Sequence, residues 1–265
     1  MKIGIVIPLK SKSIAKNWAV TTDNLKATIN SVIAQTKDDY QAVVVGHDKP
    51  EFINTIKRTD KCEFQYLKEI EPPRIGRIEA ENQISYEKDR CSKILKGVIY
   101  LKSKYPDITH WFALDADDLL HDEFIEELQK YEEKPAIILN HGYVLFKSTG
   151  IVNVEDEFSA YCGSSAVLAD SLFELPSRVF EDSFKKIPFG AISHVTMKEA
   201  LAKQGVEIVV PNQRLVMYVR DNGENISNDA YYDTLIKRLK KGIKMLLKAR
   251  NLDSETKAHF GLYEP

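Results

Sequence analysis

The feature that most constrains the fold is an apolar run that ends in three carboxylates, Trp111-Phe-Ala-Leu-Asp-Ala-Asp-Asp-Leu-Leu120. The run contains neither glycine nor proline, which predicts a buried strand. Side chains alternate along a strand, so Asp115 and Asp117 should project to the same side where the strand leaves the sheet. Carboxylates are costly to bury unpaired, whereas a divalent cation accepts hard oxygen ligands and relieves their repulsion. The run therefore predicts metal-assisted chemistry, on a phosphorylated substrate, at a strand end.

These carboxylates allow two other interpretations. An EF-hand loop that starts at Asp115 would need glycine at its sixth position, where this chain has Leu120, so that interpretation fails. The second is a helix cap formed by Asp117 or Asp118, because a helix is predicted over residues 121–131. In that case Asp118 is the expected capping residue if only one of the carboxylates caps the helix.

The first half of the chain alternates strand and helix patterns. Strands are predicted over residues 2–8, 41–45 and 62–67, and helices over residues 24–36 and 80–104. This order predicts an α/β fold, a Rossmann-like, mostly parallel sheet with helices on both faces. Ligands of such sheets bind beyond the carboxyl ends of the strands, where Asp48 and Asp115 lie.

The second half of the chain is less regular, and its predicted elements are strands over residues 136–139, 143–146, 163–168 and 206–210 and a helix over residues 192–203. We expect one catalytic domain over residues 1–225 and a C-terminal amphipathic helical extension over residues 226–265. Within the extension, residues 235–250 place leucine and isoleucine on one face and lysine and arginine on the other. A helix packed on the domain with a solvated basic face is the preferred interpretation, and peripheral contact with an anionic membrane is the alternative.

Composition excludes several classes of protein. The 265 residues carry a formal net charge of -2, which argues against a general nucleic-acid-binding protein. No apolar segment is long enough to span a bilayer, and the run that ends at Pro8 is interpreted as a first strand, not as a signal peptide. The three cysteines have neither disulfide-like nor zinc-like spacing. We expect a cytoplasmic protein, with peripheral contact at the inner face of the membrane as the alternative.

The chain resembles the family 2 glycosyltransferases of the GT-A fold over about residues 1–225. The resemblance rests on five motifs, Gly4-Ile-Val-Ile-Pro8, Ala42-Val-Val-Val45, Phe112-Ala-Leu-Asp-Ala-Asp-Asp-Leu-Leu120, Tyr161-Cys-Gly-Ser-Ser165 and Val179-Phe-Glu-Asp-Ser-Phe184. It implies a GT-A fold and inverting transfer of a sugar from a nucleotide-diphosphate sugar, usually a UDP-sugar. The acceptor would be a hydroxyl of a glycan, a lipid-linked molecule or another compound, as in polysaccharide biosynthesis, and the cofactor would be Mn²⁺ or Mg²⁺.

The resemblance also implies roles for the residues that match the family's motifs. Asp117 would bind the metal directly, and Asp115 would meet the ribose or a metal-bound water. Pro8 and Lys10 would form a wall of the nucleotide site, and Asp48 would hold the base. These assignments predict one nucleotide and metal site at the ends of three strands.

Further residues are implied on either side of that site. Arg90 and Lys93 stand where the family places a basic contact to the nucleotide, although a solvated helix face is an equally good explanation of these two residues. Gly163 and Ser164 match the segment that lines the pocket for the acceptor or the donor sugar, and glycine at such a place lets backbone approach a ligand closely.

The catalytic base is the position at which the sequence departs from the family pattern. An inverting transfer needs a base to remove the proton of the attacking hydroxyl, and the family supplies it from an acidic pair before a late helix. If residues 179–184 match the acidic stretch that comes before the base in many relatives, the base position falls at His194, and imidazole, with a pKa of about 6.5, is suited to the task. Asp182 is the alternative base, and the alternatives for His194 are a metal ligand and a hydrogen-bonded core histidine. The missing acid leaves a catalytically silent protein that binds sugar nucleotides or glycans as a second hypothesis. A nucleotidyltransferase is disfavoured because residues 8–13 contain no glycine.

Overall fold

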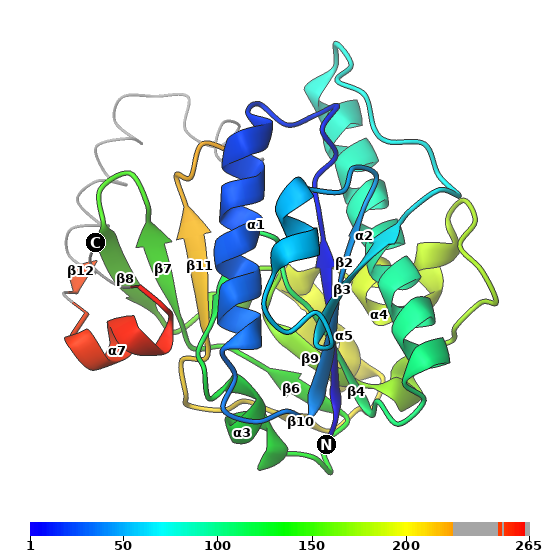
Figure 1. The fold of residues 1–265 in the computed structure, drawn as a ribbon. Helices are drawn as coiled ribbons and strands as arrows, with labels where there is room; N and C mark the ends of the chain where they lie inside the picture. The colour runs from blue at the N-terminus through cyan, green and yellow to red at the C-terminus, as the bar shows by residue number, and fades with distance from the viewer. Residues whose placement is uncertain (225–248, 251, 263–265) are drawn as a thin grey trace.

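The computed structural model describes residues 1–224, 249–250 and 252–262 (Figure 1). Its strands are β1 (Ile3–Pro8), β2 (Tyr40–Gly46), β3 (Cys62–Tyr66), β4 (His110–Ala113), β5 (Leu119–Leu120), β6 (Ala136–Ile138), β7 (Gly142–Phe146), β8 (Ile151–Glu155), β9 (Ala166–Ala169), β10 (Ile208–Val209), β11 (Val216–Arg220) and β12 (Ala249–Arg250). Its α-helices are α1 (Trp18–Ile33), α2 (Glu79–Lys104), α3 (Phe124–Gln129), α4 (Pro188–Ala191), α5 (Met197–Lys203) and α7 (Ser254–His259).

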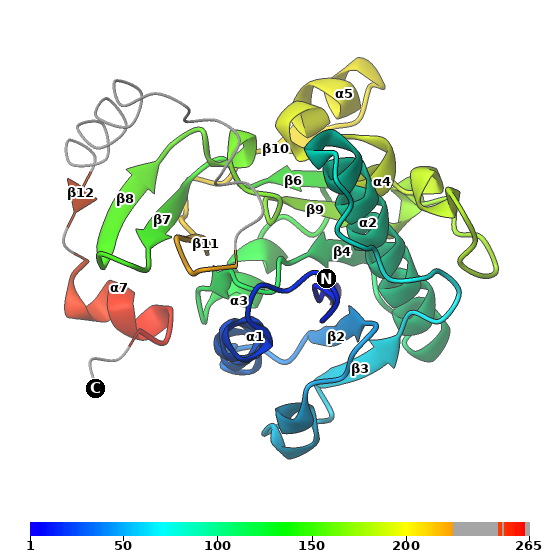
Figure 2. The same ribbon diagram turned by 90° about the horizontal axis from the view of Figure 1, so that it is seen from above.

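A seven-stranded sheet with the order β10-β6-β9-β4-β1-β2-β3 forms the centre of the molecule. Strand β9 runs antiparallel to β4 and to β6, and the other pairings in this sheet are parallel. Helix α1 lies on one face of the sheet and α2 on the other (Figure 2). The predicted α/β class, with a mostly parallel sheet and helices on both faces, is confirmed.

Strand β1 is buried along its whole length, and its alternating side chains serve two cores. Ile5 and Ile7 pack in one cluster with residues of α1 and α3, and Val6 packs in the other with residues of α2. Helix α2 approaches the strand closely at Gly97, where a Cβ would lie only 2.4 Å from Val6 Cγ1. This contact fixes the helix that carries Arg90 against the strand that ends at Pro8.

A second sheet of five strands, with the order β12-β8-β7-β11-β5, lies beside the first. It corrects the prediction of one strand through residues 111–120. The run is divided between the sheets, because β4 ends at Ala113 and Leu119–Leu120 form β5, which pairs antiparallel with β11. Between them the chain turns, and the backbone N–H of Asp118 donates to the carbonyl of Asp115 at 3.1 Å. The three carboxylates therefore lie where the chain crosses from one sheet to the other.

Several predicted helix boundaries differ from the observed ones. Helix α1 begins six residues before the predicted start, because the Asn17 side chain accepts the backbone N–H groups of Ala19 and Val20 and caps it. The helix predicted over residues 121–131 is limited to α3. The helix predicted over residues 192–203 is divided into the 3₁₀ turn His194–Thr196 and α5.

Most of the amphipathic helix predicted over residues 235–250 lies outside the described residues. Its last two residues are not helical, since Ala249–Arg250 form β12 and pair antiparallel with β8. Helix α7 then follows, and Phe260 packs against Leu119, Met217 and Val219 of the second sheet. Within the described part of the chain, no helix combines the length and the apolar character that crossing a membrane requires.

Candidate active site

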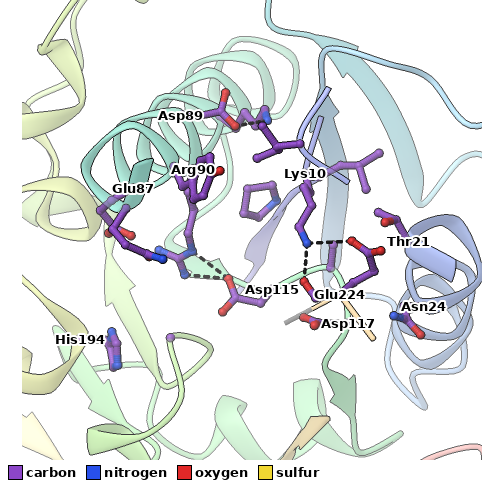
Figure 3. A pocket seen from close by; sticks show the side chains of 18 of the residues that line it. Lys10, Thr21, Asn24, Glu87, Asp89, Arg90, Asp115, Asp117, His194 and Glu224 are labelled. Carbon is purple, nitrogen blue, oxygen red and sulfur yellow. Dashed lines mark hydrogen bonds and ion pairs between the residues drawn. The ribbon is translucent and has the colours of Figure 1, made fainter. Parts of the chain in front are cut away.

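A pocket of about 430 Å³ opens where β1, β4 and β11 end, between α1 and α2 (Figure 3). Its volume lies within the range typical of small-molecule sites. The residues predicted from the sequence that line it are Pro8, Lys10, Arg90, Lys93, Asp115, Asp117, Gly163 and His194. Asp48, Ser164 and Asp182 are not part of its described wall.

Asp115 is held by two residues, Arg90 and Ser164. Arg90 donates from Nε at 2.9 Å and from Nη2 at 2.8 Å, both to Oδ1. The backbone N–H of Asp115 donates to Ser164 Oγ at 2.9 Å. Gly163 makes room for this arrangement, because a Cβ there would lie 2.7 Å from Arg90 Nη2 and 2.9 Å from Asp115 Oδ2. Glycine at position 163 thus follows from the close packing of an ion pair at the pocket wall.

Asp117 presents a carboxylate suited to a cation. Asn222 Nδ2 donates to its Oδ2 at 2.7 Å. Burial, and then the negative charge of Asp115, raises the pKa of Asp117 to about 6. A divalent cation would relieve both effects, and carboxylate oxygens are the ligands that Mg²⁺ and Mn²⁺ prefer. The residues present therefore fit such an ion.

Asp118 is a structural anchor. It is fully buried and accepts hydrogen bonds from Ser164 Oγ at 2.7 Å, Cys162 Sγ at 3.2 Å and the backbone N–H of Val219 at 3.2 Å. Burial, with the charges of Asp117 and Asp115, raises its pKa well above the ordinary value. The interpretation of Asp118 as a helix cap is wrong, because α3 begins at Phe124 and has no side-chain cap.

Ser164, predicted as a pocket residue, lies fully buried beneath the pocket. Its hydroxyl accepts from the backbone of Asp115 and donates to Asp118. It therefore supports the carboxylate motif from below, whereas its neighbour Gly163 reaches the wall.

Glu224, which sequence reasoning missed, joins two loops of the site. Lys10 Nζ donates to Glu224 Oε2 at 3.0 Å and also to its backbone carbonyl. The backbone N–H groups of Lys16 and Asn17 donate to the same carboxylate. Burial alone would raise the pKa of Glu224, but Lys10 and these N–H groups outweigh it and hold the pKa below its usual value. The segment after β1 is thereby fastened to the segment after β11.

A buried network lies on the α2 side of the pocket. Lys93, only 1% exposed, donates to Asp89, and the other carboxylate oxygen of Asp89 contacts His47 Nε2 at 2.7 Å. Burial lowers the pKa of Lys93. Lys93 therefore does not lie on a solvated helix face, the alternative that the sequence had left open.

Asp48, predicted to hold the base of the nucleotide, is not part of the described pocket wall. Its side chain accepts the backbone N–H of Lys12 at 2.8 Å.

Asn24 carries an unsatisfied donor into the pocket. Its side chain is 5% exposed, and Lys147 Nζ, which can only donate, lies 2.7 Å from its Oδ1. That contact fixes the orientation of the amide, and Nδ2 is buried with no hydrogen-bond partner. Figure 3 shows the amide nitrogen on the side that faces Asp117 and Glu224. A buried N–H without an acceptor costs about 1–3 kcal/mol, so the arrangement favours a ligand oxygen at this place.

The two candidate bases lie in different environments. His194 lines the pocket on the wall opposite α1 (Figure 3), and burial, followed by the charge of Arg90, lowers its pKa. Asp182 is exposed, has a left-handed backbone (φ 61°) and pairs with Lys185 at 3.1 Å and Lys88 at 3.7 Å. Of the two, His194 is the residue that the structure places at the pocket.

Comparisons with known proteins give a distant structural similarity. No family model matches the chain, and no curated protein matches it in sequence. Among solved structures, S. aureus TarS (residues 1–349) aligns with a TM-score of 0.45 and 10% identity, over 98% of this chain and 69% of that chain. Rv0371c from Mycobacterium tuberculosis H37Rv aligns with a TM-score of 0.42 and 10% identity, over 83% of this chain and 89% of that chain. A structure of Rv0371c in complex with manganese aligns with a TM-score of 0.40 and 9% identity, over the same shares of the two chains.

Proposed function

We propose that the protein is a metal-dependent, inverting glycosyltransferase that uses a nucleotide-diphosphate sugar. The observation that carries the proposal is the convergence of Asp115, Asp117 and Lys10 in one pocket at the junction of the two sheets. A carboxylate pair beside a lysine at strand ends suits a metal-bound diphosphate. The expected donor is a UDP-sugar, and the expected acceptor is a hydroxyl of a glycan or a lipid-linked molecule.

The donor side is assigned from the contacts of the pocket residues. Asp117 would hold Mn²⁺ or Mg²⁺, and the bound cation supplies charge neutralisation for the departing diphosphate. Asp115, positioned by Arg90, would accept a hydrogen bond from the ribose. Asn24 Nδ2 would donate to a phosphate oxygen, which satisfies the buried amide. Lys10 Nζ, which pairs with Glu224, would donate its remaining hydrogen to the same oxygens.

The acceptor side is assigned to the wall that carries Gly163 and His194. Burial, and then the charge of Arg90, lowers the pKa of His194, which favours the neutral imidazole, the form that can accept a proton. His194 would take the proton of the acceptor hydroxyl as its oxygen attacks the anomeric carbon and the diphosphate leaves from the opposite face. Glu87 lines the same pocket and lies near His194. Its negative charge would stabilise the imidazolium that forms when His194 takes the proton.

A catalytically silent binding protein is the second candidate. It is favoured by the absence of a predicted acidic base from the described pocket wall. His194 is on this wall, whereas Asp182 is not. Such a protein would bind the donor through the same residues and would release no sugar. Binding and turnover must therefore be measured separately.

The test begins with binding. Thermal unfolding is followed with UDP, GDP, CDP and their sugars, with and without Mn²⁺, in the wild type, Asp117→Asn and the control Asp60→Asn, which alters an exposed carboxylate outside the pocket. A ligand at about 100 times its Kd should stabilise the fold by about 2.7 kcal/mol. We expect a Mn²⁺-dependent shift with one nucleotide, lost only in Asp117→Asn. No shift with any nucleotide would refute the donor site.

Turnover then separates the two candidates. Release of free sugar from the nucleotide-sugar identified by the binding screen is measured with Mn²⁺ in the wild type and in His194→Ala. Metal-dependent release supports a transferase, and a loss in His194→Ala that leaves binding intact supports the base. Binding without any release in the wild type would favour the silent protein.

A further inference from the structure

His121, Asp122 and His259 form a cluster outside the pocket whose candidate ligand atoms all lie within 4.8 Å of one another. We propose that this cluster is a binding site for a divalent transition metal of the zinc class, and that the ion fastens the C-terminal segment to the body of the protein. None of the three residues lines the candidate active site. The inference therefore does not depend on the proposed glycosyltransferase activity.

The three side chains are close enough for one ion to reach all of them after a local adjustment. Asp122 Oδ1 lies 2.7 Å from His259 Nδ1 and 3.4 Å from His121 Nδ1. The two rings are stacked with centroids 4.2 Å apart and an interplanar angle of 18°, so one ring must rotate before both Nδ1 atoms can point at one ion. A tetrahedral ion with bonds of about 2.0–2.2 Å separates its ligand atoms by about 3.4 Å. Of the two pairs that involve Asp122, the one with His121 already has this spacing, and the one with His259 must open by about 0.7 Å.

Both ring nitrogens must exchange a hydrogen-bond partner for the ion. The backbone N–H of Glu123 donates to His121 Nδ1 at 3.2 Å, so that nitrogen is unprotonated, and an ion would replace this N–H at its lone pair. His259 Nδ1 can donate to Asp122, and an ion would replace this proton. Two imidazoles and a carboxylate suit Zn²⁺, Co²⁺ or Ni²⁺ better than Mg²⁺ or Ca²⁺. Three protein ligands leave the fourth position to water.

The surroundings favour a cation. The carboxylates of Glu123 and Glu127 lie near His121, and that of Glu255 lies near His259, so the cluster has negative charge beside it. All three members of the cluster are half-buried, so water can reach the fourth position while the ligands stay partly shielded. The cluster thus combines two imidazoles and a carboxylate, which suit a transition metal, with further carboxylates nearby that attract a cation.

The ion would join parts of the chain that are far apart in sequence. His121 and Asp122 follow β5, whereas His259 ends α7, and the backbone N–H of Asp122 donates to the carbonyl of His259 at 3.0 Å. The next residue, Phe260, packs edge-on against His121 with ring centroids 5.4 Å apart. Phe260 also contacts Val219 of β11, the strand that leads to Asn222 and Glu224 at the pocket. Metal binding would therefore hold α7 against the strand that supports the donor site.

The test uses the full chain, freed of metal by dialysis against a chelator. Zn²⁺ binding is measured by titration calorimetry, and Co²⁺ is used as a spectroscopic probe of tetrahedral coordination. The variants are His259→Ala and His259→Asn, because asparagine can still donate from Nδ2 to Asp122 while it loses the imidazole ligand. His141→Ala is the matched control, since His141 pairs with Asp156 at 2.9 Å but belongs to no group of three metal-binding side chains in the described chain.

We expect one Zn²⁺ site and a Co²⁺ visible absorption band in the wild type, in Asp117→Asn and in His141→Ala. Both His259 variants should weaken Zn²⁺ binding by at least about 100-fold, more than the loss of a group that only orients a ligand. Unchanged Zn²⁺ affinity in His259→Asn, or no Co²⁺ band in the wild type, would overturn the proposal and leave a hydrogen-bonded cluster. Retention of the site in Asp117→Asn separates this result from the outcome of the donor-site test.

Discussion

Gly163→Ala is predicted to damage the donor site while the protein stays folded. The new methyl carbon would lie 2.7 Å from Arg90 Nη2 and 2.9 Å from Asp115 Oδ2, closer than side-chain packing permits. Gly163 is not among the described glycines with positive φ, so alanine meets no backbone penalty there. Because Arg90 ends in a long flexible side chain, the guanidinium should move away and leave Asp115.

The expected magnitudes follow from the exposure of this ion pair. A hydrogen bond between charged groups contributes about 1.5–3 kcal/mol, so its loss from the bound state should lower kcat/KM by about 10- to 160-fold. The side chains of Arg90 and Asp115 are 25% and 29% exposed. Pairs in contact with water contribute about 0–1 kcal/mol to folding, so the free energy of unfolding should fall by less than about 1 kcal/mol.

The assay combines calorimetric binding of UDP with Mn²⁺, release of sugar from the donor, and urea unfolding. Gly163→Ala is made in the wild type and in Arg90→Ala. If alanine acts by displacing the guanidinium, its additional cost in the Arg90→Ala background should be less than about 0.5 kcal/mol. Wild-type binding in Gly163→Ala, or an undiminished cost without Arg90, would refute the reasoning.

Two further predictions concern a ligand donor and acid stability. Asn24→Ala should weaken nucleoside-diphosphate binding by about 10-fold, the loss of one hydrogen bond, and leave binding of the parent nucleoside unchanged; calorimetry with both ligands checks this, and equal losses would contradict a phosphate contact. Burial alone would raise the pKa of Glu63, but hydrogen bonds from Lys104, Tyr100 and Tyr105 hold it below its usual value. Its stabilising contribution should therefore be present above about pH 4.3 and be lost as the pH falls through the lowered pKa of the folded state. Urea unfolding of the wild type and Glu63→Gln should show a difference at pH 7 that shrinks at pH 3, and a constant difference would contradict it.

The central sheet could be predicted because its strands are short apolar runs separated by helical patterns. Residues 2–8, 41–45 and 62–67 were predicted as strands, and each contains an observed one. The division of residues 111–120 between two sheets could not be predicted, because an apolar residue paired with β1 and one paired with β11 look alike in sequence. Which partner a strand finds depends on tertiary packing, which local periodicity does not contain.

The pocket shows the same limit. Asp115 and Asp117 were found because they are neighbours in sequence, whereas Lys10 and Glu224 are 214 residues apart and nothing local connects them. The sequence predicts that Asn24 lies in a helix, but it does not predict the unsatisfied amide. That amide depends on the contact with Lys147, which is 123 residues away, and on the position of Asn24 at the pocket. Asn17 did carry a readable signal, since asparagine before a helical pattern is a common cap.

The three adjacent carboxylates show how environment separates residues of one type. The charge of Asp115 is offset by Arg90 at 2.8 Å. Asp118 is fully buried and does not line the pocket, and its oxygens already accept from a hydroxyl, a thiol and a backbone N–H, so they are not offered to a cation there. Asp117 is the one that reaches the pocket with a pKa of about 6, so a cation there stabilises an ionised form that burial and Asp115 disfavour. The electrostatics thus assign the proposed metal to Asp117, and they predict that Asp118→Asn, which keeps the shape of the buried side chain, will impair metal binding far less than Asp117→Asn.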